Sequence, residues 1–342
     1  MPGSGSGEPR TTIAVVPRES YSMTATMLDT LLDRTPAPRR IVLVDGGSPR
    51  RVWRRLARLA SECDFTFVHR DAVITSNEAR NEAMRHVETE YVCFLDNDTI
   101  VDDGWLTGLE RCADETGAAL VVAAVIWGRR DHWEIHYAGG SCRIVSDGPT
   151  RRFDEHNSYM HRPVGALAEL TRTRTEYVEE HCLLARVDVL RRIGPFDEAL
   201  LAAREHSTLS LQVTAMGAEI WLEPSVVVRY PWPKRNTLAD YRFYLPRWSD
   251  AWAEPSFRRF NDTWQLTDTE IDNIFRQGHR ERRLEQRPAS RNGLRGRTRP
   301  AVLRARAGLD RVVTPLAVGA CERRRARAGP ARVLHRGSWD TA

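Results

Sequence analysis

The chain alternates between short, almost wholly apolar runs and longer stretches that are apolar on one side only. Five runs have strand length: TTIAVV (11–16), IVLVD (41–45), FTFVH (65–69), YVCFLD (91–96) and AALVVAAVIW (118–127). Segments with helical spacing separate them, at 23–32, 51–60, 77–87 and 105–112. Apolar runs separated by amphipathic helices are typical of parallel strands covered on both faces. The pattern predicts an α/β fold with a doubly wound, mostly parallel, Rossmann-like sheet.

This rhythm breaks after the fifth run. Residues 129–178 are polar and rich in His and Arg, which indicates an insertion on the C-terminal side of the sheet. Regular patterns resume with helices at 185–192 and 205–216 and a strand pair around 219–229. Residues 233–280 are rich in Trp, Tyr, Phe and Pro, and we expect a helical extension there that packs on the domain.

The two ends of the chain differ from the part between them. Residues 1–10 are a Gly/Ser/Pro leader that is predicted to be disordered, residues 11–232 one α/β domain, and residues 281–342 a partly disordered tail. The tail holds 16 arginines against 5 acidic residues, whereas the whole chain has a net charge of +5, so the main body is mildly acidic. The use of Arg in place of Lys is typical of a bacterial, high-GC coding sequence.

Cysteine usage and apolar patterning predict a cytoplasmic protein. The six cysteines are scattered without a C-x-x-C pair, as expected of core thiols in a reducing compartment. The N-terminus MPGSGSGEPR lacks the apolar region of a signal peptide. The longest apolar run, 118–127, is far shorter than the ~20 residues that span a bilayer.

Two carboxylates end the fourth run, where YVCFLD leads into Asp96-Asn97-Asp98. Ligands of open α/β sheets bind beyond the C-terminal strand ends, so we expect these side chains to face an open crevice. Carboxylates this close favour a cation, and Mg²⁺ or Mn²⁺ is commonly held by one or two carboxylates plus phosphate oxygens. The alternative is an Asx-rich turn that caps the next helix.

Three further motifs place polar residues near this edge. Asp45 ends the second run and is followed by two glycines, which allow close backbone approach. SNEARNEA opens the helix before the acidic pair, so Arg80 and Asn81 are expected to face the crevice. GPFDE at 194–198 lies a short loop before the helix that starts at residue 205.

Together, and in this order, the motifs resemble the family 2 glycosyltransferases, which have the GT-A fold. The resemblance covers roughly residues 11–230 and rests on IAVVP, IVLVDGGS, NEARNEA, YVCFLDNDTIVDDGWL, RRIGPFDEAL and E-H-x-x-L-x-L-x-x-x-x-M-G at 205–217. It implies transfer of a sugar, with inversion, from a nucleoside-diphosphate sugar to an acceptor hydroxyl. The metal and nearby cations would stabilise the departing diphosphate.

The resemblance also implies roles for single residues. Asp96 and Asp98 match the family's D-x-D motif, whose last acid usually touches the metal. Pro17-Arg18-Glu19 stands where the family usually has an aromatic-Asn pair after the first strand. The residues implied to bind the donor nucleotide are Pro17, Arg18, Glu19, Asp45, Arg80, Asn81 and Asp96.

The base position departs from the family pattern. Most relatives have the motif Glu-Asp-x-Asp-Leu-x-x-Arg, with the first Asp as base. Here the motif begins with Glu205-His206, so histidine replaces that Asp. Thr208 and Gln212 replace the second acid and the arginine. His206 is a competent base because imidazole has a pKa near ~6.5, and Glu205 is the fallback. A Glu-His pair that only caps the helix is the alternative.

A second departure lies where many relatives place a metal-binding histidine. The chain reads Arg229-Tyr230 there, so the third protein ligand is missing by this pattern, and Arg229 is a candidate to neutralise phosphate directly. His132 and His136 would share one face of a helix, which raises a zinc hypothesis. HWEIHYAGG is more typical of a strand or loop, without a third ligand at a recognisable interval, so the sequence disfavours zinc.

The insertion is expected to form the acceptor side, with aromatic residues such as Trp127, Trp133 and Tyr137 packing on sugar rings. Glu179 and Glu180 are reserve candidates for the base. The acceptor class stays open among a carbohydrate, a lipid-linked molecule and a small molecule.

The Arg-rich tail also leaves its partner open. Such segments meet anionic surfaces without sequence specificity, so a solvated tail and a peripheral contact at the inner membrane surface are alternatives. Nucleic acid is disfavoured because no interleaved aromatics or binding fold accompany the arginines. Pro315 and Gly319 are expected to weaken any long amphipathic helix there.

Two other functions compete with sugar transfer. The histidine and threonine at 206 and 208 motivate a catalytically inactive module that binds a nucleotide-sugar or a partner. A nucleotidyltransferase also uses an α/β sheet with acidic metal ligands, but the chain lacks a Gly-rich triphosphate loop after the first strand.

Overall fold

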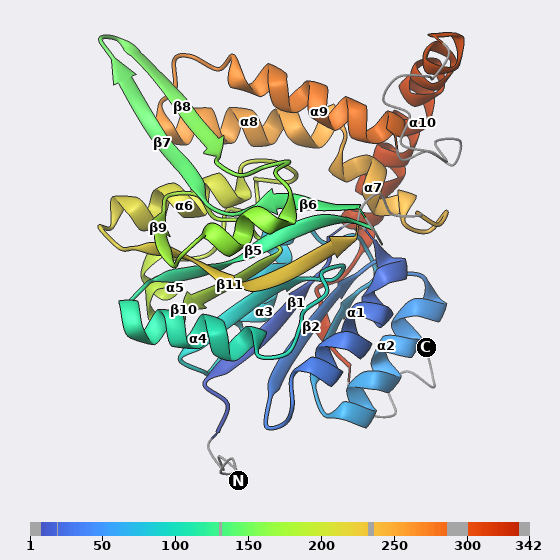
Figure 1. Ribbon diagram of the computed structural model, residues 1–342. Coiled ribbons are helices and arrows are strands. Elements are labelled where there is room, and N and C mark those ends of the chain that lie inside the picture. The colour runs from blue at the N-terminus through green and yellow to red at the C-terminus, as the bar shows by residue number, and fades with distance from the viewer. Residues whose placement is uncertain (1–7, 19, 130–131, 232–235, 286–299, 335–342) are drawn as a thin grey trace.

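The computed structural model describes residues 8–18, 20–129, 132–231, 236–285 and 300–334 (Figure 1). Within them, the centre is a ten-stranded sheet in the order β12-β3-β2-β1-β4-β10-β5-β11-β9, with β6 paired to β5. Its main strands are β1 (Thr11–Val16), β2 (Arg40–Gly46), β3 (Thr66–Arg70), β4 (Tyr91–Asp96), β5 (Leu120–Arg129), β10 (Cys182–Arg186) and β11 (Ile220–Pro231). All of these run in one direction except β10, which is antiparallel to its neighbours β4 and β5.

The predicted mostly parallel α/β sheet is confirmed, and each of the five apolar runs forms a strand. Every residue of β1 and β4 is buried, as expected of strands covered on both faces. The helices between and after them are α1 (Tyr21–Arg34), α2 (Arg50–Cys63), α3 (Ser76–Met84), α4 (Trp105–Thr116), α5 (Val187–Ile193) and α6 (Glu205–Ala215). Thr75 and Glu78 close a capping box that fixes the start of α3.

The insertion contributes strands β6 (His132–Tyr137), β7 (Gly140–Asp147), β8 (Thr150–Asn157) and β9 (Thr173–Thr175) and the 3₁₀ helix η1 (Val164–Glu169). The β7–β8 hairpin projects from the sheet toward the C-terminal helices (Figure 1). The prediction of a strand pair around 219–229 is wrong. One long strand, β11, covers this segment, and its pairing with β5 shifts register between Glu223 and Val227.

The extension predicted at 233–280 is helical, with α7 (Tyr241–Arg247), α8 (Asp250–Trp264) and α9 (Ile271–Glu285), and a further helix, α10 (Pro300–Arg327), lies in the Arg-rich tail. The expectation that Pro315 and Gly319 weaken a long helix is wrong, because α10 runs through both. Arg325 Nη1 lies 2.9 Å from Glu78 Oε2, which ties the end of α10 to the start of α3. Strand β12 (Arg332–Val333) then pairs antiparallel with β3, so this part of the tail joins the edge of the sheet.

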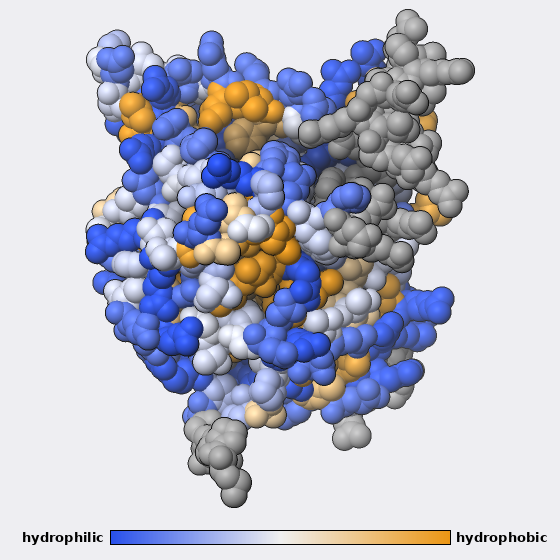
Figure 2. Space-filling model, viewed as in Figure 1, coloured by the Kyte–Doolittle hydropathy of each residue, from blue (hydrophilic) through white to orange (hydrophobic). Residues whose placement is uncertain are grey.

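The face shown in Figure 2 is mostly hydrophilic, with apolar side chains gathered over α8 and near the middle of the sheet. Within the described ranges, each helix is too short or too polar to cross a membrane.

Candidate functional site

The acidic pair lies at the C-terminal end of β4, beside the loop that follows β1. The two strands pair in register from Thr11 and Tyr91 up to Val16 and Asp96. Asn97, between the two acids, holds this loop: its Oδ1 accepts from the Arg18 backbone N–H at 2.9 Å, and its Nδ2 donates to Ser20 O. The middle residue of the D-N-D motif therefore positions Arg18 over the site.

Asp96 and Asp98 have no exposed surface, so the prediction of an open crevice is wrong for this structure. Burial raises the pKa of Asp96 to about 6, with Asp98 adding to the rise and Arg18 opposing it. Arg18 Nε lies 3.7 Å from Asp96 Oδ2. Within the described residues neither carboxylate oxygen of Asp96 accepts a hydrogen bond. Buried Asp96 oxygens that accept no hydrogen bond, next to the second buried carboxylate of Asp98, fit a bound cation, so this pair is a suitable place for Mg²⁺ or Mn²⁺.

A third carboxylate, Glu180, approaches from the loop before β10. Because β10 runs against β4, this loop comes to the same edge, and the Asp96 N–H donates to His181 O at 3.2 Å. Glu180 lies 2.8 Å from Arg80 Nη1 and 3.6 Å from Arg18 Nη1. Asp96, Arg18, Glu180 and Arg80 thus form a buried network in which acidic and basic side chains alternate. The two guanidinium groups could bind an anionic ligand.

The Arg-Asn pair of α3 divides between two tasks. Arg80 is buried over the rings of Phe94 and Phe196 and faces the charge network. Asn81 instead binds the GPFDE loop, donating to Phe196 O at 2.9 Å and accepting from the Phe196 N–H at 2.8 Å. The structure therefore gives Asn81 a role in holding this loop, and it brings Arg80 but not Asn81 into the network.

Asp45, at the end of β2, is held by two hydrogen bonds to its Oδ2, from Ser48 Oγ at 2.8 Å and with His69 Nδ1 at 2.7 Å. Burial alone would lower the pKa of His69, but the contacts with Asp45 and Asp71 outweigh it and raise that pKa. A cavity of about 490 Å³ opens beside this pair, and its lining includes Ser48, His69 and Trp53.

The two candidate bases at the start of α6 have different surroundings. Glu205 is buried with Arg247 of α7, whose Nη1 is 3.1 Å from Glu205 Oε1. His206 Nε2 is 3.4 Å from the Tyr177 hydroxyl and 3.5 Å from Glu155 Oε2. Burial lowers the pKa of His206, yet Glu155 and the nearby acids outweigh it and raise it. Glu205 serves as an ion-pair partner, which leaves His206 as the stronger candidate for a base.

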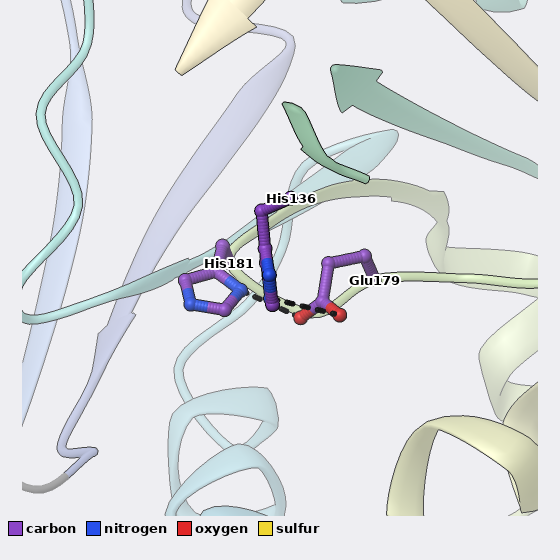
Figure 3. A group of neighbouring side chains, drawn as sticks. All are labelled: His136, Glu179 and His181. Atoms are coloured by element: carbon purple, nitrogen blue, oxygen red, sulfur yellow. Dashed lines mark hydrogen bonds and ion pairs between the residues drawn. The ribbon is translucent and has the colours of Figure 1, made fainter. Parts of the chain in front are cut away.

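Three residues of the insertion side meet next to the acidic pair. His136, Glu179 and His181 offer ligand atoms that all lie within 4.8 Å of one another (Figure 3). HWEIHY forms a strand, β6, as its pattern indicated, so His132 and His136 do not share a helix face. The residues beside His136 are Glu179 and His181, which come from a loop about forty residues further along the chain. Only the tertiary structure brings them together.

The remaining predicted residues are placed as follows. Arg229 forms a bidentate ion pair with Asp102, at 2.5 and 2.6 Å, so it is committed to the chain's own carboxylate. Pro17 lies between β1 and Arg18, next to the site. Glu19 falls outside the described residues.

Solved structures of similar architecture are GT-A glycosyltransferases. GalNAc-T7 with UDP, GalNAc and Mn²⁺ has a TM-score of 0.53 and 14% identity, and the match covers 81% of this chain and 55% of that one. The mannosyltransferase PcManGT from Pyrobaculum calidifontis, with GDP-Man and Mn²⁺, has a TM-score of 0.50 and 15% identity over 94% of this chain and 75% of that one. The predicted GT-A fold is confirmed.

The chain belongs to glycosyltransferase family 2, whose model matches residues 12–192. Pre-mycofactocin glycosyltransferases from Mycobacterium tuberculosis strains CDC 1551 and H37Rv are 23% identical to it over 209 residues. The match covers 61% of this chain and 39% of those relatives, so the chain spans about two-fifths of their length.

Proposed function

We propose that the protein transfers a sugar from a nucleoside-diphosphate sugar to an acceptor hydroxyl. The observation that carries this proposal is the buried acidic pair beside Arg18 and Arg80 in a family 2 fold. The structural relatives are described with UDP or GDP-Man and Mn²⁺, which supports the same donor class and a divalent ion here. A metal on Asp96 and Asp98 would supply charge neutralisation to the diphosphate.

The side chains of this chain have separate tasks in the transfer. The nucleoside is proposed to occupy the cavity lined by Ser48 and His69, both of which are hydrogen-bonded to Asp45. Arg18, and Arg80 behind it, would turn from Glu180 and Asp96 toward the diphosphate, where their charge stabilises the leaving group. A donor that reaches Asp96 must displace the Arg18 side chain, because that side chain lies over the carboxylate.

Bond making and breaking then follow the inverting course. The acceptor oxygen forms a bond to the anomeric carbon while the bond from that carbon to the diphosphate oxygen breaks, and its electron pair leaves with the nucleoside diphosphate. His206 takes the acceptor proton, a contribution worth roughly 10²–10⁴-fold in rate. Tyr177 and Glu155 orient the imidazole and stabilise its protonated form.

The test is release of nucleoside diphosphate. The purified chain is incubated with UDP- and GDP-sugars, Mn²⁺ and a panel of acceptors, and the expected result is acceptor-dependent release that Asp98→Asn abolishes. Asp103→Asn is the matched control, because that side chain lies five residues further on and is 78% exposed. Donor binding without release would favour the inactive module, and release of pyrophosphate would mark a nucleotidyltransferase.

A further inference from the structure

Three side chains with no part in the proposed transfer meet beside the acidic pair. His136 comes from β6, and Glu179 and His181 come from the loop before β10 (Figure 3). Glu179 Oε1 lies 2.6 Å from His181 Nδ1, and Glu179 Oε2 lies 3.9 Å from His136 Nε2. Both imidazoles are buried, and the Glu179 side chain is 12% exposed. The three side chains converge on one point from two elements that flank β5 on the edge where the strands end.

His136 is not satisfied as a core histidine normally is. Its Nδ1 is buried and has no hydrogen-bond partner within the described residues, and its Nε2 is too far from Glu179 for a hydrogen bond. Two ligand atoms that each lie ~2.1 Å from a tetrahedral ion are about 3.4 Å apart, so the spacing of His136 and Glu179 is close to that of two ligands sharing an ion. The 2.6 Å contact between Glu179 and His181 is a hydrogen bond that an ion would replace.

The ligand set differs in chemistry from the acidic pair. Asp96 and Asp98 offer only oxygen, which suits Mg²⁺ or Mn²⁺, whereas two imidazoles and one carboxylate suit Zn²⁺ and related transition metals. Aromatic rings wall the cluster and fix the imidazoles: Trp127 lies 4.9 Å from His136, and Tyr230 lies 4.4 Å from His181, between ring centroids.

We infer that His136, Glu179 and His181 bind one divalent ion of the zinc type, at a site separate from the acidic pair. The three protein ligands leave a fourth position for water or another oxygen ligand. An ion here ties β6 to the loop 177–181, and that loop carries Glu180, the partner of Arg80 and Arg18. This inference does not rest on the proposed sugar transfer.

Metal content and a cobalt spectrum test the inference without any sugar donor. The full chain is stripped with a chelator and titrated with Zn²⁺ against a chromophoric competitor, and Co²⁺ is used as a visible probe of the ligand geometry. We expect one equivalent of Zn²⁺, at least tenfold weaker binding in His136→Gln and in Glu179→Gln, and unchanged binding in Asp98→Asn. His132→Gln is the matched control, because that histidine is exposed on the same strand.

Folding is checked by melting the metal-free variants, since only variants that melt like the metal-free parent are compared. Should both variants misfold, the Co²⁺ spectrum of the parent chain decides: the absorption of a four-coordinate nitrogen and oxygen site supports the inference, and that of a six-coordinate oxygen site overturns it. Zn²⁺ binding that survives His136→Gln, or that is lost in Asp98→Asn, would also overturn it. The first result would leave a metal-free Glu179–His181 ion pair, and the second would put the ion on the acidic pair.

Discussion

Replacing Arg247 with methionine should lower the melting temperature sharply, because it would leave Glu205 as an unpaired charge in the interior. The two side chains are 3.1 Å apart, with 5% and 1% of their surface exposed. Burial alone would raise the pKa of Glu205, but Arg247, Arg18 and smaller contributions together outweigh burial and lower that pKa, so the folded state holds the carboxylate ionised. Breaking such a pair from one side costs about 3–5 kcal/mol, since the remaining charge keeps its desolvation penalty.

The expected fall in melting temperature is about 4–7 °C, because an unfolding entropy of ~2.1 cal/mol/K per residue makes each kcal/mol worth roughly 1.4 °C in a chain of 342 residues. Calorimetry measures the melting temperature, and release of nucleoside diphosphate is measured on the same samples. The double variant Glu205→Gln with Arg247→Met should recover much of the loss, since neither charge is then stranded. Arg276→Met is the control: its partner Glu254 forms an ion pair that is 35% and 40% exposed, which is worth about 1 kcal/mol or less.

Two results would refute this reasoning. If Arg247→Met melts at the same temperature as Arg276→Met, the buried pair does not stabilise the fold. Alternatively, Glu205→Gln would abolish transfer while its melting temperature stays that of the parent, and Glu205 would then belong to the chemistry as the base.

Three other predictions concern the histidines. His206→Asn should lower kcat by roughly 10²–10⁴-fold, because it removes the proposed base but keeps a polar side chain. In the parent, kcat/KM should rise with pH through the pKa of His206, which lies above its ordinary 6.5, and Glu155→Gln should move that midpoint to lower pH. The pKa of His69 is also raised, so its pairing with Asp45 contributes its full stabilisation of the fold below pH 6.5. This stabilisation is lost as the pH rises through the folded-state pKa. His69→Gln should therefore remove this pH dependence from the melting temperature.

Each of these has its own control. His156→Gln changes an exposed residue next to Glu155 and should leave the pH midpoint of kcat/KM unchanged. If Glu155→Gln also leaves this midpoint unchanged, a group other than His206 titrates. For His206, retained turnover in the asparagine variant would contradict its role as base. For His69, a melting profile with the same pH dependence in parent and variant would show that other groups set it.

The sequence by itself determined the five strands of the first half, the helices between them and the family. Apolar runs and amphipathic spacing are local properties, and they fix which face of each element is buried wherever the partner lies. The ends of parallel strands share one edge, so Asp45 and the Asp96–Asp98 pair could be assigned to that edge from their positions alone. The continuous helix α10 could not be predicted in this way, because the contacts of its end with α3 and with Asp71, just after β3, outweigh the local effect of Pro315.

Only the tertiary structure decided how the charged groups combine. Glu180 and His181 reach Asp96 because β10 is inserted antiparallel beside β4, and no local pattern encodes that choice of neighbour. The same packing separates Arg80 from Asn81, pairs Glu205 with Arg247 and brings Glu179 to His136. Buried charges must be neutralised by other groups of the fold. The partner of each buried charged side chain therefore depends on which distant segments pack beside it, and this is decided only when the whole core forms.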